Sequence, residues 1–192
     1  TAGKEEIEAY RNNVASHQVL IEDEDWDLVR YMRDSIMKND LARELLEHST
    51  TCFEHSHFYT KQVETESGIK TVKMRVRPDI KNREFSAIVD LKSIAPNLAW
   101  DDAVMSHGYD LQSVMYPDGV YESEGWMPDN FWFFVTEKTK ENPVTEVFSL
   151  DDWHKERGLS QYHAGMKRFA ELNQSGDWFL PSITRKPKWA KN

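Results

Sequence analysis

The stretch Arg77-Pro78-Asp79-Ile80 is followed, after a short spacer, by Ile88-Val89-Asp90-Leu91-Lys92, and apolar, β-branched residues flank both carboxylates. Asp90 and Lys92 are two residues apart, so on a strand their side chains project from the same face. If the two stretches pair as a hairpin, Asp79 joins them in a pocket rich in oxygen ligands. Hard divalent cations such as Mg²⁺ prefer these ligands, and a neighbouring lysine can stabilise a developing phosphate charge. The pattern therefore predicts metal-assisted hydrolysis of phosphodiester bonds.

The segments upstream of these motifs predict helices followed by strands. Apolar residues recur at helical spacing behind an acidic first turn at 24–37. A second helix is expected over 40–47, with Asp40 as its cap. Three strands in a meander should follow, at 52–63, 69–77 and 85–91.

The downstream segments complete a mixed α/β domain with a central sheet. A helix is expected over 100–116, ended by Pro117-Asp118-Gly119. The nearly all-apolar run 131–136 is typical of a strand buried on both faces, with a neighbouring strand at 144–150. A long amphipathic helix should then run from 152 to about 173, and the tail after it is expected to be extended.

Length and composition favour one sizeable domain. The chain has 192 residues, of which 39% are hydrophobic, and we expect a single domain over 1–192. Because it opens at Thr1 without a Met, we expect this domain to lack an N-terminal portion. No run approaches the ~18 apolar residues of a membrane span. The lone Cys52 excludes an internal disulfide and a cysteine-rich zinc site. We therefore expect a cytoplasmic protein that does not contact membranes.

The net charge of −9 argues against a protein that binds nucleic acid through overall positive charge. Overall charge does not report the charge that lines a groove, however. Basic residues cluster at 70–77, 155–168 and 185–188, whereas acidic residues concentrate in the first fifty positions. This asymmetry permits a basic surface on one side of the molecule.

Two elements together resemble a known nuclease superfamily. Asp79, preceded by Pro78 and followed by Asp90-Leu91-Lys92, matches the PD-(D/E)xK pattern. Gln112 and Tyr116, four residues apart on the helix expected after the third strand, resemble the QxxxY element of the RecB-like nucleases. The resemblance implies a restriction-endonuclease-like α/β fold, with a mixed central sheet flanked by helices.

A closer resemblance is to the nuclease domain of exodeoxyribonuclease VIII, the RecE-type enzyme, and it extends from about Lys4 to the end of the chain. The segments that carry it are Arg75-Val76-Arg77-Pro78-Asp79, His107-Gly108-Tyr109-Asp110-Leu111-Gln112, Phe131-Trp132-Phe133-Phe134-Val135 and Lys188-Trp189-Ala190-Lys191.

This resemblance implies roles for the site residues. Asp79 and Asp90 would be direct metal ligands, together with the Leu91 carbonyl, and Lys92 would orient or activate the attacking water. Glu54 is a further candidate ligand, with an ordinary polar strand residue as the alternative.

The resemblance also implies a site for DNA. Gln112 and Tyr116 would hold the DNA near the metal; the alternative is a polar pair that simply lies on the surface of the helix. Arg75 and Arg77 lie on the strand that leads to the site and are candidates for DNA binding; pairing with the surplus of acidic residues is the alternative.

One departure from the family concerns a metal-associated histidine. Members usually carry it on a helix upstream of the sheet, in a G-x-x-x-H context. Here His17 has no glycine at the matching spacing, and His55 and His57 come too late. We expect that helix to belong to a portion outside this chain; an incomplete metal site is the alternative.

The resemblance implies an exodeoxyribonuclease that uses Mg²⁺, or Mn²⁺ in its place. It would degrade linear double-stranded DNA from its ends in the 5′-to-3′ direction and leave 3′ single-stranded tails for recombination by strand annealing. It further implies a toroidal homo-oligomer (tetramer or trimer), a RecT-type single-strand annealing partner and a bacterial or phage origin. Two alternatives stay open: a structure-specific or nicking endonuclease of the same fold, and a catalytically inert DNA-binding or assembly module.

Overall fold

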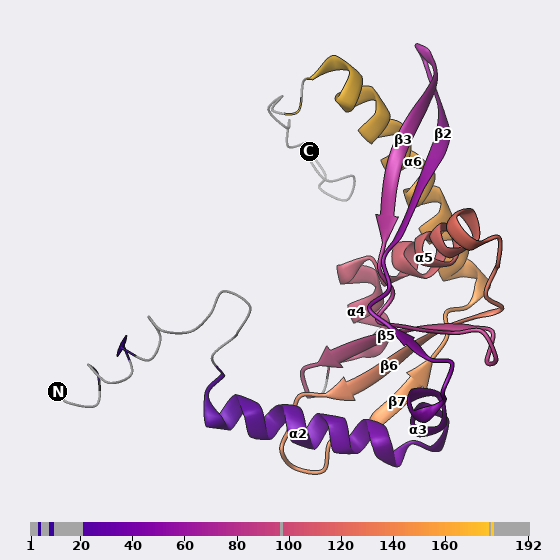
Figure 1. The fold of residues 1–192 in the computed structure, drawn as a ribbon. Coiled ribbons are helices and arrows are strands. Elements are labelled where there is room, and N and C mark those ends of the chain that lie inside the picture. Colours follow the sequence, from indigo (N-terminus) through magenta and orange to yellow (C-terminus); the bar gives the residue numbers. More distant parts are fainter. Residues whose placement is uncertain (1–3, 5–7, 10–20, 97, 177, 179–192) are drawn as a thin grey trace.

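The computed structural model describes residues 4, 8–9, 21–96, 98–176 and 178, and it has the mixed α/β architecture that the sequence predicts (Figure 1). The first elements are α2 (Asp23–Lys38), α3 (Asp40–Glu47), β1 (Cys52–Phe53), β2 (His57–Thr65), β3 (Gly68–Val76), β4 (Ile80–Asn82) and β5 (Ala87–Ile94). They are followed by α4 (Trp100–His107), α5 (Tyr109–Glu124), β6 (Asn130–Glu137), β7 (Thr145–Phe148) and α6 (Asp152–Ser175).

The strands form two sheets. The main sheet has five strands in the order β1-β4-β5-β6-β7, in which β5 and β6 are parallel and the other neighbours are antiparallel. Among the described strands, β2 and β3 pair only with each other, from His57 opposite Val76 to Thr65 opposite Gly68. This hairpin stands out from the main sheet as an arm, with α6 beside it (Figure 1).

Helices cover both faces of the main sheet (Figure 1). On one face, Val89 and Phe134 pack with Ala42 and Leu45 of α3. On the other face, Phe133 and Val135 pack with α4 residues such as Trp100. The alternation of side chains along β5 and β6 thus supplies residues to two apolar cores.

The predicted meander of three strands is wrong. The expected strand at 52–63 divides at Glu54, whose backbone φ of +53° is incompatible with an extended strand. Consequently β1 joins the main sheet beside β4, whereas β2 turns away into the arm. The strand pattern was correct locally, but it did not show which strands pair.

The prediction of one helix over 100–116 is wrong in two respects: the segment forms two helices, and the second ends later than predicted. Gly108 adopts a left-handed conformation, with φ of +69°, and separates α4 from α5. α5 then continues through Pro117 as far as Glu124. An interior proline costs about 3 kcal/mol, but this turn is buried against the arm: a Cβ at Gly119 would lie 2.5 Å from Val76 Cγ2. Tertiary packing outweighs the local stop signal.

The remaining helices and strands are confirmed to within two residues: 24–37, 40–47, 131–136, 144–150 and 152–173. Asn39, rather than Asp40, caps α3, because Asp40 is already helical and the Asn39 side chain accepts a hydrogen bond from Ala42 N over 3.1 Å. The extended tail and its segment 188–191 lie outside the described residues. Within the described ranges, no helix is both long and apolar enough to cross a membrane.

Candidate active site

The pairing of β4 with β5 brings the two aspartates together. Ile80 lies opposite Val89 in this antiparallel pair, so Asp79 and Asp90 are neighbours across the strands. The backbone N–H of Leu91 donates a hydrogen bond to Asp79 Oδ2 over 2.7 Å. The hairpin predicted from the two β-branched runs is therefore present, with both carboxylates at one edge of it.

Asp90 is almost fully buried, with 2% of its surface exposed. Its Oδ2 forms an ion pair with the Lys92 ammonium, and its Oδ1 accepts a hydrogen bond from Gln112 Nε2. Burial raises the pKa of the Asp90 carboxyl to about 6; Lys92 opposes this rise, and the charge of Asp79 adds to it. The positive charge of Lys92 therefore does not fully offset the effect of burial on the Asp90 carboxylate.

Lys92 is held between an acid and an aromatic ring. Its ammonium contacts Asp90 and lies 4.6 Å from the centroid of the Tyr109 ring, in a cation–π arrangement. Tyr109 in turn stacks on Trp100, with ring centroids 5.5 Å apart. The sequence did not indicate this role for Tyr109, although the residue falls within the segment 107–112 that resembled the RecE-type helix.

α5 carries the QxxxY pair into the site. The helix begins directly after the left-handed Gly108, and this start directs Gln112 toward Asp90. Tyr116 lies one turn further along. Burial raises the pKa of the Tyr116 hydroxyl, while its hydrogen bond with Gln112 opposes that rise. The break that sequence reasoning missed is therefore what sets the direction of the site helix.

One pocket of about 670 Å³ unites nearly all the predicted site residues. Its lining includes Arg75, Arg77, Asp79, Asp90, Leu91, Lys92, Gln112 and Tyr116. Their sequence positions span three separate elements, yet the fold places them around a single hollow. His107 and Tyr109 line it too, and neither was predicted as a site residue.

Glu54 lies outside this lining. Its backbone N–H donates a hydrogen bond to the Asp79 carbonyl over 2.9 Å, but its carboxylate pairs with Arg77, with 2.9 Å between Oε2 and Nε. The structure thus brings Glu54 next to Asp79 through the backbone, while the side chain neutralises an arginine of the pocket. Its role as a metal ligand stays a prediction.

The pocket fits a hard divalent cation. Asp79 and Asp90 offer carboxylate oxygens and Leu91 a backbone carbonyl, and oxygen donors of this kind suit Mg²⁺ and Mn²⁺. The raised pKa of Asp90 indicates that a further positive charge nearby would stabilise its ionised form.

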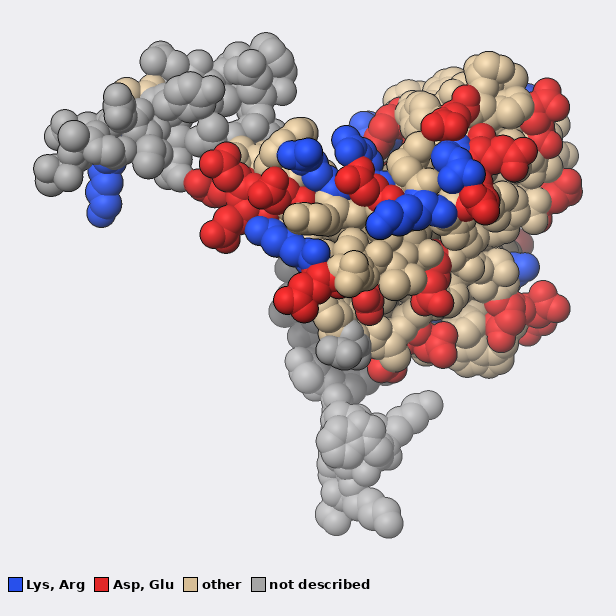
Figure 2. Space-filling view, turned by 90° about the horizontal axis from the view of Figure 1, so that it is seen from below, with Lys and Arg blue, Asp and Glu red and all other residues tan. Residues whose placement is uncertain are grey.

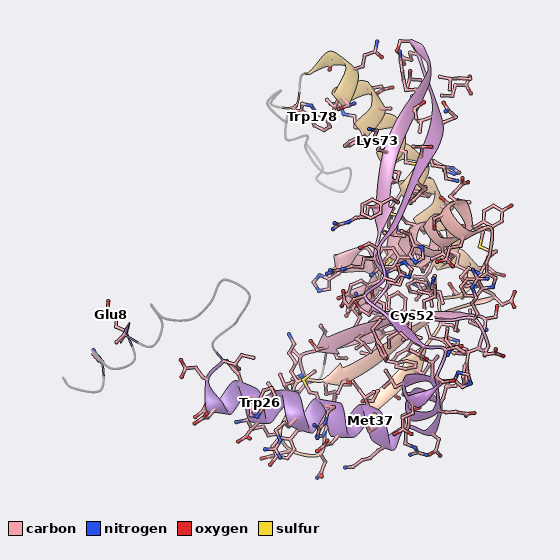
Figure 3. The ribbon with its side chains drawn as sticks, viewed as in Figure 1. Glu8, Trp26, Met37, Cys52, Lys73 and Trp178 are labelled. Carbon is pink, nitrogen blue, oxygen red and sulfur yellow. The ribbon has the colours of Figure 1, made fainter. Side chains whose placement is uncertain are left out.

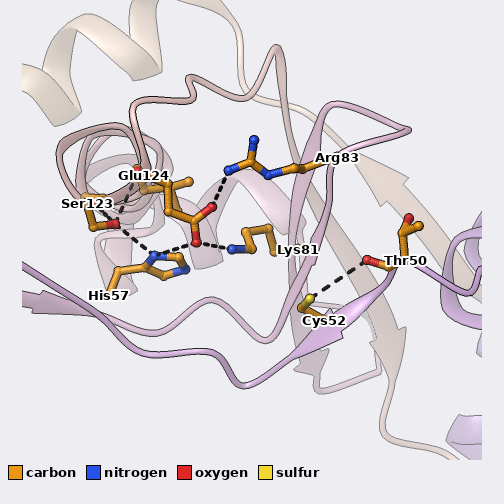
Figure 4. A network of polar contacts seen from close by, with 9 residues as sticks. Thr50, Cys52, His57, Lys81, Arg83, Ser123 and Glu124 are labelled. Atoms are coloured by element: carbon orange, nitrogen blue, oxygen red, sulfur yellow. Dashed lines mark hydrogen bonds and ion pairs between the residues drawn. The ribbon is translucent and has the colours of Figure 1, made fainter.

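A second polar cluster lies at the other end of α5 (Figure 4). Glu124 accepts hydrogen bonds from Lys81 and Arg83, the latter over 2.7 Å. The buried His57 places Nδ1 2.9 Å from Ser123 Oγ and 3.4 Å from Glu124 Oε1. Burial lowers the pKa of His57, and the nearby Lys81 lowers it further.

Ligand atoms of His55, His57 and Glu124 all lie within 4.8 Å of one another, so these three residues could hold a metal ion. Burial would raise the pKa of Glu124, but hydrogen bonds from Lys81 and Arg83 outweigh burial and lower it. Because two cations already neutralise this carboxylate, we interpret the cluster as a clamp between α5 and β4.

Comparisons with known proteins agree with this fold. The chain is similar to the crystal structure of a protein from Eubacterium rectale whose assignment as an exonuclease is provisional, with a TM-score of 0.63 and 16% identity over 95% of this chain and 70% of that chain. At this identity the likeness shows the fold alone. The structure of SSO0001 gives a TM-score of 0.37 at 15% identity, over 91% of this chain and 89% of the other, and carries no argument.

A comparison with curated proteins gave no match by sequence. A family model described as "PDDEXK-like domain of unknown function (DUF3799)" matches residues 4–180. The described sheet with its flanking helices is the restriction-endonuclease-like fold expected from the sequence. The chain therefore belongs to the PDDEXK-like family.

Proposed function

We propose that this protein is a divalent-metal-dependent exodeoxyribonuclease that hydrolyses linear double-stranded DNA. The observation that carries the proposal is the convergence of Asp79, Asp90, Lys92 and Gln112 on one pocket. Membership of the PDDEXK-like family and the shared fold support a nuclease. The exonuclease character rests on the resemblance to the RecE type.

Each residue of the pocket has a task in this chemistry. The carboxylates of Asp79 and Asp90, with the Leu91 carbonyl, would hold the cation, which when bound supplies charge stabilisation and an acidified water. Lys92 would stabilise charge that develops on the phosphate oxygens. Gln112 holds the Asp90 carboxylate in one orientation. Arg75 adds positive charge to the pocket lining, whereas Glu54 offsets the charge of Arg77.

We extend the proposal to the direction of cutting and to the assembly. On the resemblance to exodeoxyribonuclease VIII, cutting proceeds 5′-to-3′ with Mg²⁺, leaves 3′ tails for strand annealing and takes place in a toroidal homo-oligomer beside a RecT-type partner. A ring would place the pocket along an enclosed DNA path despite the net charge of −9.

End-labelled linear duplex DNA tests the proposal directly. We expect Mg²⁺-dependent release of 5′ label, no release in EDTA and no cutting of covalently closed circles. Asp79→Ala and Lys92→Ala should each abolish release, whereas Asp34→Asn and Lys38→Ala on the exposed surface of α2 should not. Cutting of closed circles would support the endonuclease alternative. Equal activity of the Asp79→Ala variant would refute the site.

A further inference from the structure

The arm formed by β2 and β3 carries a row of positive charge that leads into the pocket. Lys73, Arg75 and Arg77 occupy alternate positions and are exposed, whereas Met74 and Val76 between them are partly and fully buried. Residues two apart on a strand are separated by about 6.6 Å, a repeat close to that of successive phosphates on an extended nucleic-acid strand. The row ends beside Pro78-Asp79.

This positive charge is not cancelled on the arm itself. The cross-strand partner of Lys73 is Thr60, and that of Arg75 is Phe58. Within the described part of the chain, neither Lys73 nor Arg75 forms an ion pair, whereas Arg77 pairs with Glu54. Lys73 lies on the part of the arm that rises above the sheet (Figure 3). Among the described residues, two cations without an ion-pair partner are thus found here: Arg75 in the lining of the pocket and Lys73 two residues before it on β3.

The face seen in Figure 2 has a different character. There the Lys and Arg side chains are interspersed with Asp and Glu side chains over the region around α2. Mixed charges of this kind attract a polyanion weakly, because neighbouring carboxylates repel its phosphates. The row on β3 is the better candidate for a nucleic-acid path.

A second hollow, of about 330 Å³, runs between β3, α5 and α6 and shares Arg75, Leu111 and Met115 with the active-site pocket. Its apolar lining includes Met74, Met166 and Phe169, and 43% of the Phe169 surface is exposed. Lys73 and Arg75 line the same hollow. The two hollows are therefore neighbours that share three lining residues, and we treat them together as one groove, lined by cations and by apolar side chains.

We propose that this groove, defined by Lys73, Met74, Arg75, Met115, Met166 and Phe169, binds the unpaired DNA strand next to the scissile phosphate. A hollow of this volume suits one or two unstacked bases and not a duplex. Aromatic and apolar side chains bind the faces of all four bases, while the cations contact the backbone. The inference rests on the proposed function, because it assigns the substrate strand a path out of that same pocket.

Binding measured in EDTA separates this proposal from catalysis. Fluorescence anisotropy with a labelled oligo-dT strand and with a labelled duplex of equal length gives both affinities without cutting. Lys73→Gln/Arg75→Gln should weaken binding of the single strand by about tenfold and reduce the slope of log K against log salt by about 1.4, since each phosphate contact on a single strand contributes about 0.7. The duplex affinity should fall less than the single-strand affinity, because Arg75 but not Lys73 lines the active-site pocket.

A second double variant controls for the change in charge, and a further single variant tests the contact with bases. Arg30→Gln/Lys38→Gln makes the same charge change on exposed α2 positions and should leave the oligo-dT affinity unchanged. Phe169→Ala should weaken oligo-dT binding while leaving the salt slope unchanged, because it removes base contact only. Thermal melting of each variant shows that it is folded.

The outcomes are distinguishable. Unchanged oligo-dT binding in folded Lys73→Gln/Arg75→Gln, with Mg²⁺-dependent cutting intact in the wild type, overturns the groove and leaves the nuclease proposal standing. If oligo-dT binding depends on the groove but the wild type cuts no DNA, the groove stands and the nuclease proposal is overturned. A duplex affinity that falls as much as the single-strand affinity also overturns the groove, because the row would then be a general DNA contact.

Discussion

The carboxylate of Asp79 accepts a hydrogen bond from the backbone N–H of Leu91, with 2.7 Å between Oδ2 and N. This bond joins the residue that precedes β4 to the middle of β5, one residue beyond Asp90. It fixes the spacing of the two carboxylates before any cation arrives. The pocket is therefore preorganised by backbone pairing.

The stability that Asp90 contributes to the metal-free protein should be lost as pH rises through the acidic range. The pKa of Asp90 is raised from 3.8 to about 6, so the folded state binds this proton more tightly than the unfolded state. The stabilisation is complete below pH 3.8 and is lost as pH rises toward 6. This rise in the pKa of Asp90 corresponds to roughly 3 kcal/mol.

Urea unfolding in EDTA between pH 4 and 8 measures this contribution. The wild type should lose stability between about pH 4 and 6, and Asp90→Asn should lack that loss because an amide does not titrate. Parallel pH profiles for the two proteins would show that Asp90 is not the titrating group.

Mg²⁺ should stabilise the protein more at pH 8 than at pH 5. At pH 5 the buried Asp90 is largely protonated, and a proton competes with the cation for the same oxygens. The difference in melting temperature with and without Mg²⁺, added well above its Kd, measures this stabilisation at each pH. Asp79→Asn/Asp90→Asn should show no Mg²⁺-induced shift at either pH, and a shift that persists would place the cation elsewhere.

Gln112→Leu should lower the cleavage rate by roughly 10- to 100-fold, the range typical of residues that orient metal ligands. The leucine leaves Asp90 Oδ1 without the donor that now fixes it. Initial rates with end-labelled duplex measure the effect. Gln174→Leu, at an exposed position near the end of α6, is the matched control and should cut at the wild-type rate.

Tyr109→Phe should retain cleavage, whereas Tyr109→Leu should reduce it about five- to tenfold. The Lys92 ammonium lies over this ring, and a phenyl face keeps a cation–π attraction worth about 1–2 kcal/mol that leucine lacks. Single-turnover rates distinguish the two. Equal losses in both variants would indicate that the hydroxyl, and not the ring face, is required.

Removing one partner of the clamp between Glu124 and Lys81 should lower the free energy of unfolding more than replacing both partners. Glu124→Ala leaves the buried Lys81 without its partner, and removal of one member of a buried pair costs about 3 kcal/mol. The double variant Lys81→Met/Glu124→Leu should recover most of that loss. Urea unfolding of the single and double variants tests this, and additive losses would argue against coupling.

Local patterns predicted several of the candidate residues that the fold brings together in one pocket. Two β-branched runs gave the hairpin of Asp79 and Asp90, and the spacing of Gln112 and Tyr116 gave one helix face. These relationships survive because they depend on strand and helix periodicity. The predicted boundaries of that helix were wrong, because Gly108 divides it and packing against the arm allows it to continue past Pro117.

Contacts between distant positions were beyond prediction. The pairing of Glu54 with Arg77, the clamp of Glu124 with Lys81 and the position of Tyr109 beneath Lys92 all depend on how elements meet in space. Composition and spacing do not encode which polar residues become partners across such separations. Equally, strand propensity could not show that β2 and β3 leave the main sheet to form the arm.

The attachment of α5 at Gln112 and at Glu124 has a consequence for changes in chain length. These two residues are separated by about 18 Å of helix, and each inserted residue adds 1.5 Å and turns the helix by about 100°. One added or deleted position between them would rotate one attachment away from its strand. Length variation in this chain should therefore be tolerated at the arm's turn around Ser67 and Gly68, while the span from Gln112 to Glu124 is fixed in length.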